Sequence, residues 1–143
     1  MQFISPQQAE AKVAARHRVM VILWMAILAS LFVLLILALA VPSSGTSNQT
    51  LTSTLLGLSL VAAIVSVGVK RHLLKQAIDK QELQPFMSAY VIAFALCESA
   101  ALFGLLNHFA TGSVYYRVQF SIAAIGMLLH FPKKDHVRAV SRI

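Results

Sequence analysis

Glu98 is the residue whose type and position most directly suggest chemistry. It lies near the middle of an apolar run from Phe86 to Asn107, which as one helix is roughly 33 Å long and could cross a bilayer. A charged carboxylate at that depth costs roughly 2.5–3.5 kcal/mol. The cheaper states are a protonated acid, or a carboxylate that faces a partner or a water-filled cavity. Glu98 is therefore predicted to bind an ion or to hydrogen-bond another helix.

Three serines could form a polar layer with Glu98. Counted at about 1.5 Å per helical residue, Glu98 lies about 14 Å below the outer end of its run, and Ser59, Ser30 and Ser121 lie about 12, 16 and 10 Å below theirs. Each hydroxyl could accept from a protonated Glu98 or donate to its carboxylate. The alternative is that the depths match by coincidence and the serines only allow close helix packing.

Small residues at helical spacing mark the expected packing faces. The third apolar run carries Ala93, Cys97, Ala101 and Gly104, and the second carries Ala63 beside its serines. Such residues let helix backbones approach closely in a membrane. Cys97 is the only cysteine, so it cannot form an internal disulfide, and its apolar setting favours a packing role.

Two histidines are the candidate cofactor contacts. His72 and His130 lie at the predicted cytoplasmic ends of the second and fourth apolar runs, where they could meet and touch a haem, quinone or pigment. The alternative is that they anchor helix ends at the interface. No cofactor is predicted. The sequence has no pair of histidine or cysteine metal ligands at i, i+3 or i+4, no nucleophile–base set and no phosphate-binding glycine loop, so neither a metal site nor an enzyme is expected.

The elements that must position these residues follow from composition. Of 143 residues, 58% are hydrophobic and 12% are charged, whereas soluble domains carry about 25% charged residues. We therefore predict an all-α integral membrane protein, a single domain over 1–143, with four transmembrane helices at about 19–41, 51–69, 86–107 and 114–131. The second helix is expected to continue into water from Lys70 and to end near Gln84-Pro85, because proline disfavours helix in the residue before it.

The distribution of basic residues predicts the orientation. Of the twelve Lys and Arg residues, eleven lie in the N-terminal segment, the middle loop and the C-terminal segment, and only Arg117 lies near the other side. Basic segments stay cytoplasmic, so both termini are expected in the cytoplasm, most simply at a bacterial inner membrane. The formal net charge of +7 is read as topology and lipid contact rather than nucleic-acid binding, because no basic patch is interleaved with aromatic residues.

The segment from Ala95 to Leu106 resembles the carboxylate-bearing helix of ATP synthase subunit c. Glu98-Ser99 is followed by Phe103-Gly104-Leu105 at matching spacing, and the second and third spans form a hairpin with a basic loop, as in that family. The resemblance implies that Glu98 is an ion-carrying carboxylate. It is local, because the span at 51–69 contains only two glycines where that family's partner helix carries one at every second position.

Two functions remain open from the sequence. The first is a small non-catalytic subunit that docks onto a larger membrane complex, such as a bioenergetic or electron-transfer complex, with Glu98 as an interhelical hydrogen-bonding group. The second is a proton or cation carrier or channel subunit in which Glu98 binds the ion. The first is favoured because ion carriage normally needs a relay, and no second ionisable group lies at a similar depth. The expected partners are the lipid bilayer and other membrane subunits or further copies of the chain.

Overall fold

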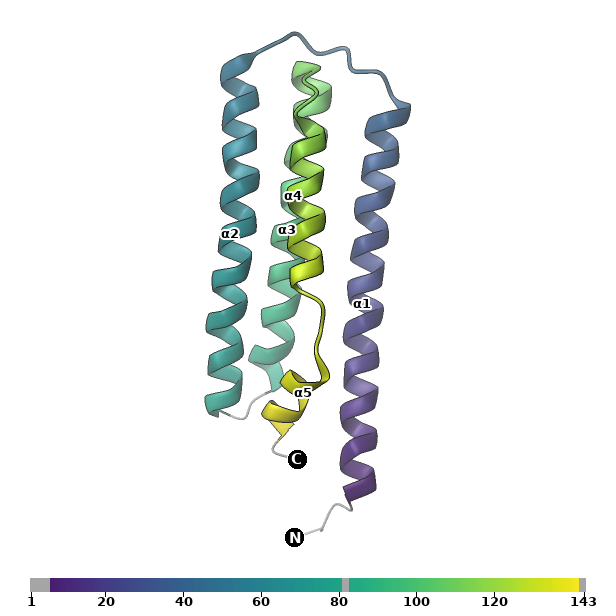
Figure 1. The fold of residues 1–143 in the computed structure, drawn as a ribbon, viewed down its shortest axis with the longest axis vertical. Helices are drawn as coiled ribbons and strands as arrows, with labels where there is room; N and C mark the ends of the chain where they lie inside the picture. The colour runs from purple at the N-terminus through teal and green to yellow at the C-terminus, as the bar shows by residue number, and fades with distance from the viewer. Residues whose placement is uncertain (1–5, 81–82, 142–143) are drawn as a thin grey trace.

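The computed structural model describes residues 6–80 and 83–141. This part of the chain is a bundle of helices without strands, which confirms the all-α prediction. In chain order the helices are α1 (Pro6–Ala40), α2 (Gln49–Lys80), α3 (Leu83–Thr111), α4 (Tyr116–Leu129) and the short α5 (Lys134–Ser141) (Figure 1).

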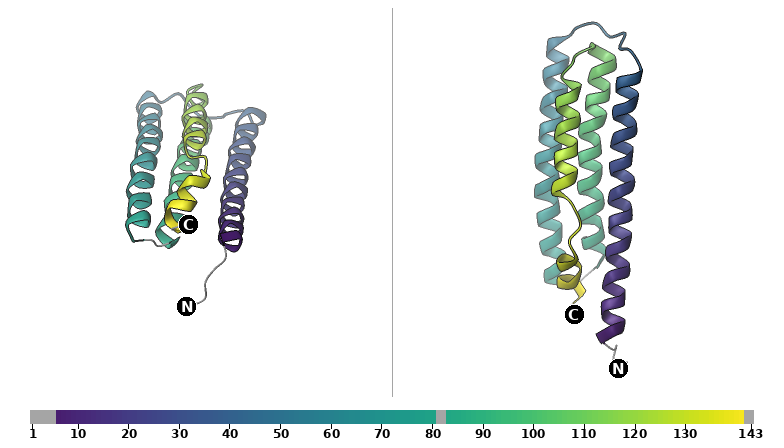
Figure 2. Two further views of the ribbon diagram at one scale, coloured as in Figure 1. Left: turned by 60° about the horizontal axis from the view of Figure 1, so that its bottom comes forward. Right: turned by 45° about the vertical axis from the view of Figure 1, so that its right-hand side comes forward.

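The helices pack in an order that leaves α1 on one side. α2 and α3 share the most extensive contact, α4 packs on both of them, and α1 contacts α3, α4 and α5 without touching α2. Two further views show α3 and α4 between α2 and α1 (Figure 2). The residues that build the polar sites therefore come mainly from α3 and α4 and from the faces that α1 and α2 turn toward them.

Local signals explain where the helices begin and end. The side-chain oxygen of Asn48 accepts the Leu51 N–H at 3.0 Å, a typical N-cap arrangement for α2. Gly112 has a φ of 65° and its N–H donates to His108 O at 3.0 Å, the left-handed cap with which many helices end. This cap ends α3 at Thr111, and the chain then reverses into α4.

The core is built from aromatic side chains of α3 and their neighbours. Phe86, Tyr90 and Phe94 recur every four residues on one face of α3 and are fully buried. Trp24 of α1 is buried beside them in the same cluster; its Nε1 donates to Met127 O of α4 at 2.8 Å. This hydrogen bond joins the two helices, and it satisfies the indole N–H that burial would otherwise leave without a partner.

The helix boundaries differ from the bounds of the predicted spans. α1 begins at Pro6, well before the span predicted at about 19–41, and α4 at Tyr116–Leu129 covers most of the span predicted at about 114–131. α2 ends at Lys80 and α3 begins at Leu83, so Pro85 does not end α2. It lies in the first turn of α3, where the missing proline N–H would have no intrahelical partner in any case. The short helix α5 after Pro132 was not predicted.

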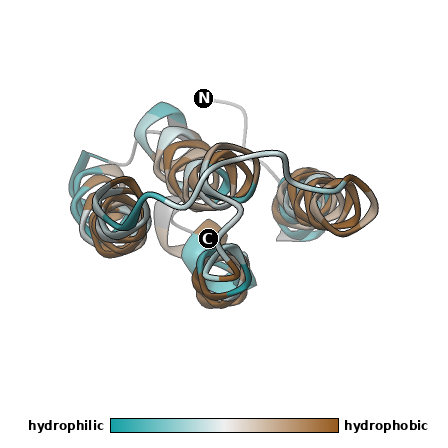
Figure 3. Cartoon of the chain, turned by 90° about the horizontal axis from the view of Figure 1, so that it is seen from above, coloured by the Kyte–Doolittle hydropathy of each residue, from teal (hydrophilic) through white to brown (hydrophobic). Residues whose placement is uncertain are grey.

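Within the described residues, three helices are long and apolar enough to cross a membrane. They are Glu10–Ala40, Gln49–Lys80 and Gln84–Thr111, and Tyr116–Leu129 is a shorter apolar helix. Seen from above, apolar residues cover outward-facing as well as inward-facing parts of the helices (Figure 3). Large exposed side chains such as Ile22, Phe32 and Ile64 fit an integral membrane location, because lipid is the solvent that such a surface prefers.

Candidate functional site

Glu98 lies at the contact between α1 and α3. The Ser30 hydroxyl of α1 donates to Glu98 Oε1 at 2.5 Å, and both side chains are only partly buried. Among the described residues, Glu98 has no cation within salt-bridge distance and no second hydrogen bond. The pair therefore joins two helices through one oxygen, and the rest of the carboxyl group's hydrogen-bonding capacity is not used within the described part of the chain.

The other two predicted serines are not brought to Glu98. Ser59 of α2 is fully buried and donates to Ala100 O of α3 at 3.2 Å or to Leu55 O at 3.0 Å. Ser121 of α4 is exposed, and its hydroxyl donates to Arg117 O of its own helix at 2.9 Å. Of the expected polar layer, only Ser30 and Glu98 are in contact.

Ser59 instead belongs to a buried polar network that extends toward the C-terminal end of α3, at Thr111. Gln119 Nε2 of α4 donates to Ser59 Oγ at 3.0 Å, and Gln119 Oε1 accepts from Asn107 Nδ2 at 2.8 Å. The Thr111 hydroxyl lies 2.8 Å from Asn107 Oδ1, and Thr52 of α2 donates to Thr111 at 3.2 Å. The network connects α2, α3 and α4. Sequence reasoning missed it, although two amides in or beside apolar runs were a visible signal.

The residues predicted to form packing faces lie where helices approach closely. Ala93, Cys97 and Ala101 are fully buried on α3. A Cβ atom at Gly104 would lie 3.1 Å from the Cβ of Gln119, and one at Gly126 would lie 2.8 Å from Cys97 Sγ. Ala63 of α2 is partly buried and lines an apolar groove between α2 and α4.

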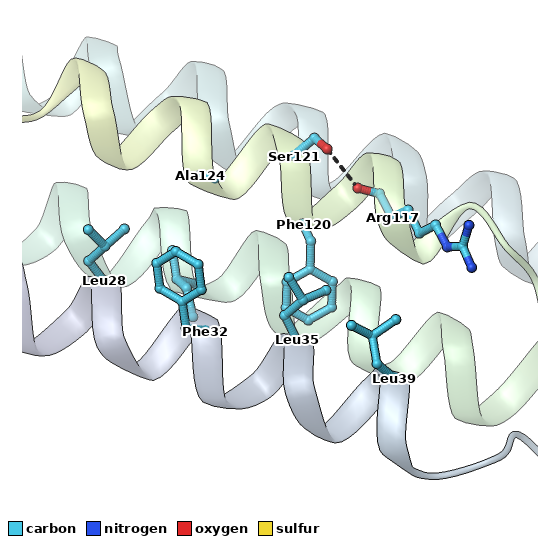
Figure 4. A pocket seen from close by; sticks show the side chains of 9 residues that line it. Leu28, Phe32, Leu35, Leu39, Arg117, Phe120, Ser121 and Ala124 are labelled. Atoms are coloured by element: carbon cyan, nitrogen blue, oxygen red, sulfur yellow. Dashed lines mark hydrogen bonds between the residues drawn. The ribbon is translucent and has the colours of Figure 1, made fainter.

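A second apolar groove lies between parts of α1 and α4. Leu28, Phe32, Leu35 and Leu39 of α1 face Phe120, Ser121 and Ala124 of α4 across a cavity of about 370 Å³, and Arg117 lies at one end (Figure 4). The polar lining is limited to Arg117 and Ser121. On α1, Ser30 is two positions from Phe32, about 200° around the helix, so the Glu98 contact lies on the opposite flank of α1 from this groove.

The histidines occupy different surroundings. His72 is exposed, and its Nε2 lies 3.3 Å from the Gln76 amide nitrogen. His130 is buried, and its Nε2 lies 2.9 Å from the Ser66 hydroxyl. No contact joins the two histidines within the described residues, so they are not brought together as a ligand pair. No group of three or more His, Cys, Asp or Glu side chains that could hold a metal occurs in the part of the chain that the structure describes.

His136 and Tyr90 connect α5 to α3. The Tyr90 hydroxyl and His136 Nδ1 are 2.7 Å apart, and the Lys70 ammonium lies 4.5 Å from the Tyr90 ring centroid. Burial lowers the pKa of His136, and the positive charges of Lys70 and Lys133 lower it further, whereas Asp135 opposes the shift. The Nδ1 atom of a neutral His136 can accept a hydrogen bond from the Tyr90 hydroxyl, and this bond holds α5 against α3.

No family profile matches the chain, and comparisons with curated proteins and with solved structures found no significant match.

Proposed function

We propose that this protein is a small non-catalytic subunit that docks onto another membrane protein through the α1–α3 flank carrying Glu98. In this proposal the three long helices and the shorter α4 lie in a bacterial cytoplasmic membrane with both termini inside. The first turns of α1, the last turns of α2 and the short helix α5 lie toward one end of the bundle (Figure 1), and ten of the twelve basic residues belong to the described segments at or near that end. The positive-inside rule supports placing that end in the cytoplasm.

The observation that carries the proposal is the incomplete hydrogen bonding of Glu98. Its carboxyl group is partly exposed and bonded only to Ser30 among the described residues. Lipid tails offer no hydrogen-bond partner, and polar groups inside a membrane almost always face a bundle interior, a cavity or one another. A donor or acceptor from a second membrane protein would satisfy the remaining oxygen, as polar side chains do between membrane helices.

The surroundings of Glu98 support docking better than ion carriage. A carrier needs its carboxyl group to exchange a proton or cation with a relay, and among the described residues the Glu98 carboxyl is hydrogen-bonded to a serine and not to an ionisable side chain. The Ser30 bond instead holds the carboxyl at the edge of the α1–α3 contact. The position suits a fixed contact with a partner helix. The carrier alternative is supported instead by the local similarity to ATP synthase subunit c.

The test compares Glu98→Gln with Glu98→Ala in protein purified from its own membranes in mild detergent. The particle mass of the solubilised assembly is measured by native mass spectrometry. We expect the wild type to carry a stoichiometric second protein, Glu98→Gln to keep it because the amide can both accept and donate, and Glu98→Ala to lose it. Ser121→Ala is the matched control, because that serine lies at similar predicted depth but bonds its own helix.

A wild-type particle that contains one chain, lipid and detergent would refute docking. A ring of identical chains would show self-association and support the carrier alternative. That alternative also predicts a different behaviour for Glu98→Gln, which would assemble normally and abolish ion flux in reconstituted vesicles. Normal flux in the assembled Glu98→Gln protein would count against the carrier.

A further inference from the structure

A basic pocket lies at the end of the bundle where α5 packs, well away from Glu98. Lys70 and Arg71 of α2, His130 at the end of α4 and His136 of α5 line a cavity of about 330 Å³. The positive charge of Lys133 acts on Lys70. The negative charge of Asp135 acts on His136 and offsets part of the positive charge near the pocket. Val67, Leu74 and Leu129 complete the lining, so the cavity combines cations and imidazoles with an apolar wall.

Lys70 is the strongest indication that an anion belongs in this pocket. It is 9% exposed, and the described residues give it the Tyr90 ring but no carboxylate within salt-bridge distance. Buried charges in proteins are normally paired, because removal from water strongly disfavours an isolated ion. A negatively charged ligand would supply the missing partner of Lys70.

His130 provides a second, independent indication. It is 2% exposed and lines the pocket, but its Nδ1 atom has no hydrogen-bond partner among the described residues. The Ser66 hydroxyl can donate to His130 Nε2 at 2.9 Å or to Ala63 O at 2.7 Å. When it donates to Nε2, the ring proton is on Nδ1 and is available to a ligand oxygen.

An apolar groove continues from the basic pocket along α2 and α4. Val67 and Leu129 line both cavities. The groove occupies about 300 Å³ and extends past Ala63 to Leu60 on α2 and past Ile125 on α4, which is about 10 Å along α2. The two cavities are therefore continuous. The part beside Lys70 and Arg71 carries positive charge, and the part between Leu60 and Val67 of α2 and the facing residues of α4 is apolar.

We infer that the basic pocket and this groove together bind one anionic phospholipid. Its phosphate accepts hydrogen bonds from Lys70 and Arg71, with His130 completing the site, and one acyl chain lies in the α2–α4 groove. The charge of the pocket selects a phosphate, which basic pockets between membrane helices commonly bind. The apolar continuation selects a lipid over free phosphate. The site uses α2, α4 and α5 and is independent of docking at Glu98.

The test is a lipid titration of the purified full-length protein followed by native mass spectrometry. Phosphatidylglycerol is the anionic lipid, phosphatidylcholine has the same tails with a neutral headgroup, and glycerol 3-phosphate supplies a phosphate without tails. We expect one phosphatidylglycerol per chain to survive detergent exchange, phosphatidylcholine to bind about tenfold more weakly, and glycerol 3-phosphate to compete only poorly.

Two variants examine the two halves of the site. Lys70→Gln should weaken phosphatidylglycerol binding about tenfold, as expected for the loss of a charge-assisted contact, whereas Lys75→Gln removes an exposed lysine of the same helix and should change it less than about twofold. Ala63→Phe fills the groove while leaving every cation in place, and should weaken both lipids. Thermal unfolding of each variant shows whether it is folded.

Several outcomes would overturn the inference. Equal effects of Lys70→Gln and Lys75→Gln would show non-specific attraction by the basic surface. Tight glycerol 3-phosphate binding that Ala63→Phe does not change would show a site for free phosphate. Equal binding of both lipids would show that the pocket charge has no role. A loss of binding confined to Lys70→Gln and Ala63→Phe, in folded protein, would support the phospholipid site.

Discussion

The buried network around Gln119 leads to a prediction about pairwise energetics. Gln119 accepts from Asn107 Nδ2 at 2.8 Å and donates to Ser59 Oγ at 3.0 Å, and all three side chains are fully buried. Replacing Asn107 or Gln119 with leucine leaves one polar atom of the other amide without its hydrogen bond, whereas replacing both removes the two atoms together. The double variant should therefore lose less unfolding free energy than the sum of the losses in the two single variants.

The magnitudes follow from counting the groups left without a partner. In Gln119→Leu, Asn107 Nδ2 loses its acceptor, while Ser59 still donates to a backbone carbonyl, so the cost is about 1–3 kcal/mol. In Asn107→Leu, Gln119 Oε1 loses its donor, and Thr111 can still donate to the residue 107 carbonyl, so we expect about 1 kcal/mol. The double variant should be about 1 kcal/mol more stable than the sum of the two losses predicts.

The assay is reversible unfolding of the purified protein in mixed micelles as the fraction of denaturing detergent rises. The free energy of unfolding is measured for the wild type, both single variants and the double variant. Independent sites add within about 0.3–0.5 kcal/mol. Additivity within that range would refute the reasoning, since it would mean that Asn107 and Gln119 do not depend on each other.

Two further predictions concern the α3–α4 contact and α5. Gly126→Ala places a Cβ atom 2.8 Å from Cys97 Sγ and should lower the unfolding free energy by about 1–3 kcal/mol in the same assay. Adding Cys97→Ala should restore most of that loss. Gly57→Ala is the control, because nothing lies within 4 Å of its Cβ position, and it should not lower the unfolding free energy. Burial lowers the pKa of His136 below its ordinary value of about 6.5, so its stabilising contact with Tyr90 is complete above that pH and is lost as the pH falls below it. The unfolding free energy should fall from pH 7 to pH 5, less so in His136→Phe, and equal falls in both proteins would refute this role.

The helices were predictable because a long apolar run has few alternatives. The runs at 51–69 and 86–107 lie wholly within α2 and α3, since an apolar backbone in a membrane must satisfy its own hydrogen bonds. The extensions into polar sequence were harder to predict, because they depend on tertiary contacts. Lys70 does not extend into water from α2 but is buried against Tyr90, a partner that no local pattern reveals.

The candidate site shows the same division between what sequence spacing determines and what packing determines. Residue counting sets the depth of a side chain in a helix, but its direction around the helix depends on which neighbours pack there. Ser121 and Gln119 differ by two positions, about 200° around α4, so the predicted serine faces outward while the overlooked glutamine joins the buried network. Ser30 met Glu98 because its depth and direction both agree. A polar residue in an apolar run is therefore a reliable indication of a site, but its partner can be identified only when the packing faces are known.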